Sequence, residues 1–232
     1  MTDINPMRHE PIFNPATFYQ PVHIIGAGAT GSRLWLALVE LGVSNISIYD
    51  YDRVESHNIA NQIYNHLDVG TAKVEALKNH YYLKTGVAPP EDRMAFHNIK
   101  VTSNSIRDLS GIVFILTDTM ASRREIYGAY CLSNPRVSRV IETRMASTHG
   151  AVYNVDPNNS AQSKAWLASL VEDDAPGETS ACGAGISVGP TASLIANLAV
   201  WQFILSHTDP VGMNTLVEAY FKPLIVTPTE LI

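Results

Sequence analysis

The chain has 232 residues, of which 46% are hydrophobic and 16% are charged, and its formal net charge is -6 at pH 7. This length and composition are typical of a packed globular protein, and the length alone does not require a second domain. The acidic charge argues against a nucleic-acid binder, because no basic stripe is present to neutralise phosphates. The two cysteines are too few for a disulfide framework or a four-cysteine zinc site.

The polar, proline-bearing segment 1–20 has no apolar run, so we expect no signal peptide and a cytoplasmic protein. We interpret residues 1–20 as an N-terminal arm and residues 21–232 as a single domain. Residues 179–208 form a 30-residue stretch without a formal charge, which is long enough to be a membrane-span candidate. Its glycines, polar Asn197 and Gln202, and lack of basic flanks favour a buried helix over a sheet, so no membrane contact is expected.

In chain order, apolar periodicity predicts an alternation of strands and helices. The expected strands are 22–27, 45–50, 94–101, 111–118 and 136–143, with additional strands in 148–157 and 215–229, and the expected helices are 31–42, 70–86, 121–132 and 193–206. This order is typical of an α/β fold with a Rossmann-like, mostly parallel sheet, helices on both faces and additional C-terminal strands that we expect to be antiparallel.

Between the first strand and the first helix lies a G-x-G-x-x-G turn made by Gly26, Gly28 and Gly31. In such a turn the first glycine permits a tight bend, the second lets a ligand approach the backbone, and the third lets the helix pack closely. The helix then offers free N–H groups to an anion. Asp50 ends the second strand at the spacing of a carboxylate that binds ribose hydroxyls. These residues alone fit a dinucleotide-dependent oxidoreductase and an ATP-using enzyme equally well.

Lys73 and Asp118 favour the ATP-using enzyme. A triphosphate requires a cation near the phosphoryl group under attack and a carboxylate for Mg²⁺, whereas a dehydrogenase requires neither at these positions.

The spaced segments "YDYDRVESHNIANQ", "DVGTAKVEAL", "ILTDTMASRREI" and "CGAGISVGPTASLIANLAVWQ" together resemble the ThiF/MoeB-type adenylyltransferases, the bacterial relatives of ubiquitin-activating enzymes. The likeness spans roughly Val22 to Phe203. The residues that fall on the family pattern are Gly26, Gly28, Gly31, Asp50, Asp52, Val54, Asn58, Gln62, Lys73, Asp118 and Arg123.

The resemblance implies activation of the C-terminal carboxylate of a small ubiquitin-like or sulfur-carrier protein. That carboxylate attacks the α-phosphate of ATP and gives an acyl-adenylate and pyrophosphate. Asp50 would hold the ribose, Lys73 the α-phosphate and Asp118 the Mg²⁺, while Arg123 would be an ion-pair or positioning residue. Asn58 would lie beside the phosphates, with Asp52 and Gln62 also in the nucleotide site, and the enzyme is expected to be a homodimer.

Two features depart from the family pattern or leave alternatives open. The arginine that helps neutralise the outer phosphates is replaced here by Asn61, and Arg53, Arg8 or an arginine of another subunit are the candidates to replace it. Cys182 falls where sulfur-transferring members carry a reactive cysteine, but it also fits a small buried residue. Adenylation of a peptide or small carboxylate, and a binding subunit without catalysis, are the alternative functions.

Overall fold

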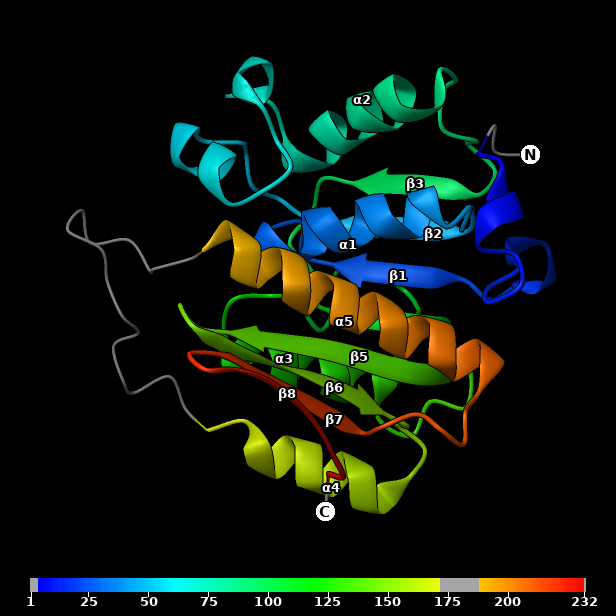
Figure 1. The fold of residues 1–232 in the computed structure, drawn as a ribbon, viewed down its shortest axis with the longest axis vertical. Coiled ribbons are helices and arrows are strands. Elements are labelled where there is room, and N and C mark those ends of the chain that lie inside the picture. Colours follow the sequence, from blue (N-terminus) through cyan, green and yellow to red (C-terminus); the bar gives the residue numbers. More distant parts are fainter. Residues whose placement is uncertain (1–3, 172–187, 232) are drawn as a thin grey trace.

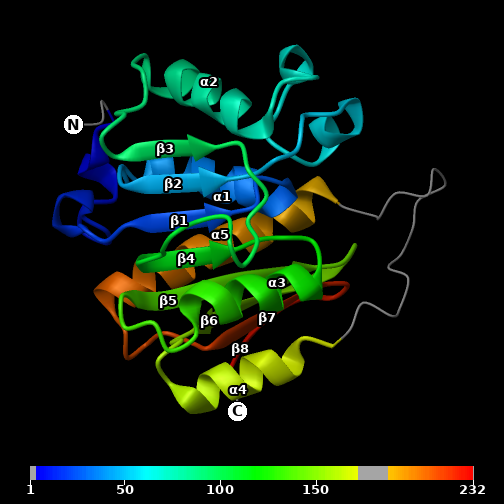
Figure 2. The same ribbon diagram turned by 180° about the vertical axis from the view of Figure 1, so that it is seen from behind.

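The structure is a computed structural model, and it describes residues 4–171 and 188–231. An eight-stranded sheet runs through the molecule in the order β3-β2-β1-β4-β5-β6-β7-β8 (Figures 1 and 2). Strands β1 to β5 pair in parallel, and β6 to β8 continue the sheet with antiparallel pairing. The strands are β1 (Val22–Ile25), β2 (Ile46–Tyr49), β3 (Met94–His97), β4 (Gly111–Ile115), β5 (Val137–Met145), β6 (His149–Val155), β7 (Leu216–Phe221) and β8 (Leu224–Thr229). The predicted fold class and the antiparallel C-terminal strands are confirmed.

Helices cover both faces of this sheet. The helices α1 (Ala29–Glu40), α2 (Lys73–Thr85) and α5 (Gly189–Thr208) lie on the face seen in Figure 1. The helices α3 (Met120–Ile126) and α4 (Ser160–Ser169) lie on the opposite face, seen in Figure 2. The sheet thus separates two apolar cores, one built around Trp35 and Phe203 and the other around Tyr127 and Trp166.

Residues 189–208 of the uncharged stretch form α5, which packs along α1 and across β5 (Figure 1). Ile195, Ala199 and Phe203 on α5 are fully buried, whereas Trp201 is half exposed. Among the described residues, no helix is long and apolar enough to cross a membrane. A buried helix over a sheet is therefore the correct interpretation of the described part, 189–208.

The segment interpreted as an N-terminal arm is packed against the domain over part of its length. Phe13 is fully buried and Phe18 nearly so, and both rings contact Phe203 of α5. Of two short 3₁₀ helices, Pro6–Arg8 precedes Phe13, and Pro15–Thr17 lies between Phe13 and Phe18.

The parallel strands bring their carboxyl ends to one edge of the sheet. The turn after β1, the Asp50 segment after β2 and the loop after β4 therefore meet there, which is where open α/β sheets bind ligands. Two further 3₁₀ helices, Ser56–Ala60 and His66–Asp68, lead from this edge to α2.

Candidate nucleotide site

The glycine turn after β1 has a shape that side chains would block at two of its three positions. Gly26 has φ +106°, and a Cβ there would lie 2.6 Å from the main-chain oxygen of Leu116. A Cβ on Gly31 would lie 2.0 Å from the oxygen of Gly26, so the start of α1 packs directly on the turn. At Gly28, by contrast, no other part of the described chain comes within 4 Å of the Cβ position, apart from the adjoining residues and the backbone of the helix itself. The turn therefore presents open backbone at Gly28, which suits the close approach of a phosphate.

Asp50 joins the glycine turn to the segment after β2. Its Oδ2 accepts a hydrogen bond from Ala27 N at 2.6 Å, and its Oδ1 accepts one from Asp52 N at 2.8 Å. Burial raises the pKa of Asp50, while Lys73 and the two backbone donors act in the opposite direction. The carboxylate is thus a structural acceptor as well as a candidate ribose ligand, since it keeps lone pairs that these bonds do not use.

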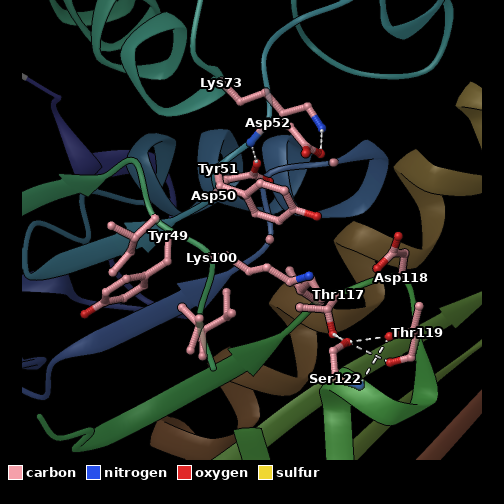
Figure 3. Close-up of a pocket in the computed structure, with 16 residues that line it drawn as sticks. Tyr49, Asp50, Tyr51, Asp52, Lys73, Lys100, Thr117, Asp118, Thr119 and Ser122 are labelled. Atoms are coloured by element: carbon pink, nitrogen blue, oxygen red, sulfur yellow. Dashed lines mark hydrogen bonds and ion pairs between the residues drawn. The ribbon is translucent and has the colours of Figure 1, made fainter. Parts of the chain in front are cut away.

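Lys73 begins α2 with its ammonium group directed at Asp52. The Nζ–Oδ2 distance is 2.9 Å, and the main-chain N of Lys73 also donates to the carbonyl of Asp52 at 2.9 Å. The Lys73 side chain is only 7% exposed, against 48% for Asp52. This pairing holds a buried cation beside the candidate ribose ligand (Figure 3).

These residues surround a cavity of about 370 Å³ at the carboxyl edge of the sheet (Figure 3). Its walls come from the ends of β1, β2 and β4, the start of α2 and the loop after β3. The predicted site residues that border it are Gly26, Gly28, Asp50, Asp52, Lys73 and Asp118. A cavity of this size with a few convergent polar groups is typical of a small-molecule site.

Asp118 stands two residues beyond Leu116 on the cavity wall, next to a group of hydroxyls that the sequence reasoning missed. Thr119 Oγ1 donates to Ser122 Oγ at 2.9 Å, and Ser122 Oγ donates to Thr117 Oγ1 at 2.7 Å. Among the described residues, no three His, Cys, Asp or Glu side chains form a metal-binding group. Mg²⁺ is commonly held by one or two carboxylates together with substrate phosphates and water. The single carboxylate of Asp118 therefore suits Mg²⁺ better than a metal that needs three protein ligands.

Arg123 lies behind the cavity wall rather than on it. Its Nε and Nη2 donate to the Thr117 carbonyl at 2.9 and 2.7 Å, and its Nη1 pairs with Glu142 at 2.7 Å. Glu142 is fully buried and also accepts from Arg144 and from Trp166 Nε1. Arg123 therefore fixes the backbone directly before Asp118, which is the geometry of a positioning residue.

Asn58 and Gln62 lie on the segment between β2 and α2, outside the cavity lining found in the described residues. Asn58 Oδ1 accepts from Glu55 N at 2.9 Å and closes a capping box. Asn61 Oδ1 and Gln62 Oε1 are buried and have no hydrogen-bond partner within residues 4–171 and 188–231. Asn61 is contacted by Arg33 of α1, whose Nε donates to the Asn61 carbonyl at 3.4 Å.

Arg53 and Arg8, the two arginines of this chain that were candidates to replace the family arginine, do not line the cavity in the described residues. Arg53 Nη1 donates to the Gly70 carbonyl at 2.7 Å, and Arg8 ends the first 3₁₀ helix. Cys182 lies outside the described residues. Cys131 is fully buried, and burial raises the pKa of its thiol to about 12, so it is a core residue.

Tyr51 and Lys100 also border the cavity, and the sequence reasoning did not single out either one. Lys100 Nζ lies 5.4 Å from the centroid of the Tyr51 ring, within cation–π range. An aromatic ring exposed at a cavity of this kind offers a stacking surface for a planar base. In the sequence, the signal that could have identified them as site residues is their position shortly after the ends of β2 and β3.

Comparisons with known proteins identify a family and a fold. The ThiF family model matches residues 18–223. The adenylyltransferase and sulfurtransferase MOCS3 of Aedes aegypti is 34% identical over 122 residues, covering 50% of this chain and 27% of that protein. The chain thus spans about a quarter of the length of that relative.

Solved structures resemble the chain over most of its length. Escherichia coli MccB with MccA-N7isoASN superposes with a TM-score of 0.71 at 14% identity, and MccB with ATP with a TM-score of 0.67 at 14% identity. PaaA superposes with a TM-score of 0.69 at 16% identity. Each comparison covers 91% of this chain and 64% of the other, so the chain spans just under two thirds of these proteins. At these identities the likeness shows the fold.

Proposed function

Because the chain belongs to the ThiF family, we propose that it is an ATP-dependent adenylyltransferase that activates a carboxylate as an acyl-adenylate. The observation that carries the proposal is the convergence of open backbone at Gly28 with Asp50, Lys73 and Asp118 around one cavity. A dinucleotide-dependent oxidoreductase explains the glycine turn and Asp50, but it gives no role to a buried lysine facing the same cavity.

The reaction needs positive charge and alignment more than acid–base chemistry. A carboxylate oxygen of the substrate forms a bond to the α-phosphorus, the bond from that phosphorus to the bridging oxygen breaks, and pyrophosphate leaves with the electron pair. Lys73 stabilises negative charge that develops on the α-phosphoryl oxygens. Asp52 holds the ammonium of Lys73 at the cavity wall, with Nζ and Oδ2 2.9 Å apart.

The remaining residues bind and orient. Asp50 accepts hydrogen bonds from the ribose hydroxyls, and the Gly28 backbone and the start of α1 receive the phosphates. Asp118 would hold Mg²⁺, which supplies charge neutralisation for the phosphates when bound. Arg123 and Glu142 fix the chain that carries Asp118.

For the second substrate we propose the C-terminal carboxylate of a small ubiquitin-like or sulfur-carrier protein. The name of the MOCS3 relative combines adenylyltransferase and sulfurtransferase, which supports a sulfur carrier as the substrate. The solved MccB complexes with MccA favour a second candidate, a peptide C terminus. Transfer to Cys182 and assembly as a homodimer belong to the same proposal. Light scattering on the purified chain tests the dimer.

Pyrophosphate exchange into ATP tests the proposed activity. We expect exchange that depends on Mg²⁺ and on an added carboxylate, with peptides ending in Gly-Gly as the first probes. Asp118→Ala should reduce the exchange rate at least about a hundredfold, because removal of an electrostatic group at the reacting phosphates typically costs that much.

Asp92→Ala is the matched control. Asp92 is an exposed aspartate that pairs with Arg93 directly before β3, so it lies at the opposite edge of the sheet from the cavity. Exchange that survives Asp118→Ala, or tight NAD binding with none of ATP in calorimetry, contradicts the proposed function.

A further inference from the structure

Tyr64 is a buried tyrosine beneath the glycine turn, in the segment between the two 3₁₀ helices that follow β2. It is 3% exposed, and its hydroxyl donates a hydrogen bond to the main-chain oxygen of Ala27 at 2.8 Å. Ala27 is the residue between the first two glycines of the turn. The phenol thus reaches across 37 positions of sequence to contact the part of the backbone that borders the cavity.

Ala27 is held from both sides. Its N–H donates to Asp50 Oδ2 at 2.6 Å, and its carbonyl accepts from Tyr64 at 2.8 Å. Two successive peptide planes of the turn are therefore fixed by side chains from outside it. A glycine turn without such bonds has more accessible backbone conformations than one made of other residues, so fixing it preorganises the site.

The bond to Tyr64 also determines where the next amide points. The Ala27–Gly28 peptide is trans, so its N–H is directed opposite to its C=O. With the carbonyl held toward Tyr64, the N–H of Gly28 is directed to the other side of the turn, where Gly28 borders the cavity. Among the described residues, no group accepts a hydrogen bond from this N–H.

We infer that Tyr64 is a positioning residue for the nucleotide, because its hydroxyl orients the Gly28 N–H toward a phosphate group. The inference rests on the proposed function, since it takes ATP as the ligand of the cavity. Burial raises the pKa of Tyr64 well above its ordinary value, with Asp50, Asp68 and Asp52 acting in the same direction. The hydroxyl therefore keeps its proton and remains a donor at neutral pH.

Calorimetry with ATP and Mg²⁺ on the full chain tests this role. Tyr64→Phe removes only the hydroxyl and keeps the ring packing. We expect the Kd for ATP to rise about tenfold, which is the upper range for one orienting hydrogen bond. A kinetic readout separates the roles further, because the same variant should raise the KM for ATP more than it lowers kcat at saturating ATP.

Tyr127→Phe is the matched control. Tyr127 is fully buried and its hydroxyl is 2.7 Å from Ser163 Oγ, but it packs against Trp166 on the opposite face of the sheet. Both variants remove a buried hydroxyl and should lower Tm, but only Tyr64→Phe should weaken ATP binding. Equal weakening in both variants, or unchanged binding in Tyr64→Phe, overturns the inference. Absence of ATP binding in the unmodified chain overturns the proposed function instead.

A measurement on the unmodified chain covers the case in which Tyr64→Phe does not fold. With ¹⁵N-glycine labelling, the Gly28 amide proton should move downfield when ATP and Mg²⁺ are added, because it gains a charged acceptor. The Gly86 amide, which donates to Tyr82 O at the end of α2, should not move. A Gly28 resonance that is unchanged at saturating ATP overturns the inference.

Discussion

Arg33 is a partly buried cation on α1, two residues after Gly31 of the glycine turn. Its Nε donates to the Asn61 carbonyl. Its Nη2 lies close to Gly189 at the start of α5, where a Cβ would be 3.4 Å away. Burial lowers its pKa, although a guanidinium stays charged at neutral pH. Within the residues that the structure describes, no carboxylate forms a salt bridge with it. A guanidinium that is partly removed from water and lacks a carboxylate partner is suited to pair with an anion.

We predict that Arg33→Gln weakens binding of ATP and of pyrophosphate by about fivefold to tenfold, the range for a charge-assisted hydrogen bond that is partly screened. The loss should shrink at high salt. Calorimetry with each ligand at two salt concentrations measures the effect. Arg93→Gln, at an exposed site before β3, is the control. Pyrophosphate affinity that is equal in both variants would contradict the prediction that Arg33 contributes to binding of these anions.

Residue types at strand ends made part of the site predictable. Asp50, Lys73 and Asp118 are charged residues that flank apolar strands or begin a helix, so topology alone brings them to one edge. Tyr64 gave no such signal, because in the sequence it is an apolar ring in a loop, and its role depends on a contact made only in the folded chain. The hydroxyls of Thr117, Thr119 and Ser122 were missed for the same reason.

At the scale of elements, the N-terminal segment contributes to the core of the domain. Phe13 and Phe18 pack on Phe203, and both rings also lie within 6 Å of the His207 ring. The composition of residues 1–20 is polar on average, so averaging over the segment hides two aromatic residues that bury their rings. Where a segment packs depends on such single large side chains more than on its mean polarity.

We predict that Phe13→Ala lowers the free energy of unfolding by about 3 kcal/mol or more, because truncating a buried phenylalanine loses its transfer energy and leaves a cavity. Tyr19→Ala, on a ring that is 81% exposed, should change it by less than about 0.5 kcal/mol. Urea unfolding followed by fluorescence measures both. A similar small effect in the two variants would mean that the segment is a detachable arm.

Helix α4 shows why one element was missed. Its sequence has no apolar stripe at helical spacing, and only Ser163 and Trp166 are buried in it. What establishes the helix is local: the Asn159 side chain accepts hydrogen bonds from Ala161 N and Gln162 N at its start. Trp166 then anchors it on the sheet, with its Nε1 donating to Glu142. A cap and one anchor are weak signals in a sequence.

At the scale of the whole molecule, the order of elements could be predicted because short, mostly apolar strands alternate with segments of helical period. Among the parallel strands, β4 is a continuous buried apolar run. The position of the cavity follows from that order. Its shape does not, because the loop after β3 and the segment between β2 and α2 close it through contacts between distant parts of the chain.

The central strands also carry a buried group that couples folding to pH. His23 on β1 lies 3.3 Å from Tyr49 OH through its Nδ1, and the Tyr49 ring stacks on His97 of β3 at 4.5 Å. The pKa of His23 is lowered to about 4, mainly by burial and in part by His97, while Asp108 acts in the opposite direction. Burial also lowers the pKa of His97.

The direction of the pH effect on stability follows from the protonation of His23 in the unfolded and folded states. In the unfolded chain His23 takes up a proton near its ordinary pKa of 6.5, whereas in the folded chain it stays neutral down to about 4. The unfolded state therefore binds more protons in this window, and the folded state loses stability as the pH falls through it. We predict that the unmodified chain loses about 2 kcal/mol more between pH 7 and pH 4.5 than His23→Gln does.

Urea unfolding at the two pH values, compared within each variant, measures this difference without depending on the cost of the substitution itself. His66→Gln, at an exposed histidine, should lose as much stability as the unmodified chain. If all three proteins lose the same free energy, the acid sensitivity belongs to other groups. If only His23→Gln resists acid, protonation of His23 on β1 accounts for the additional stability that the unmodified chain loses at low pH.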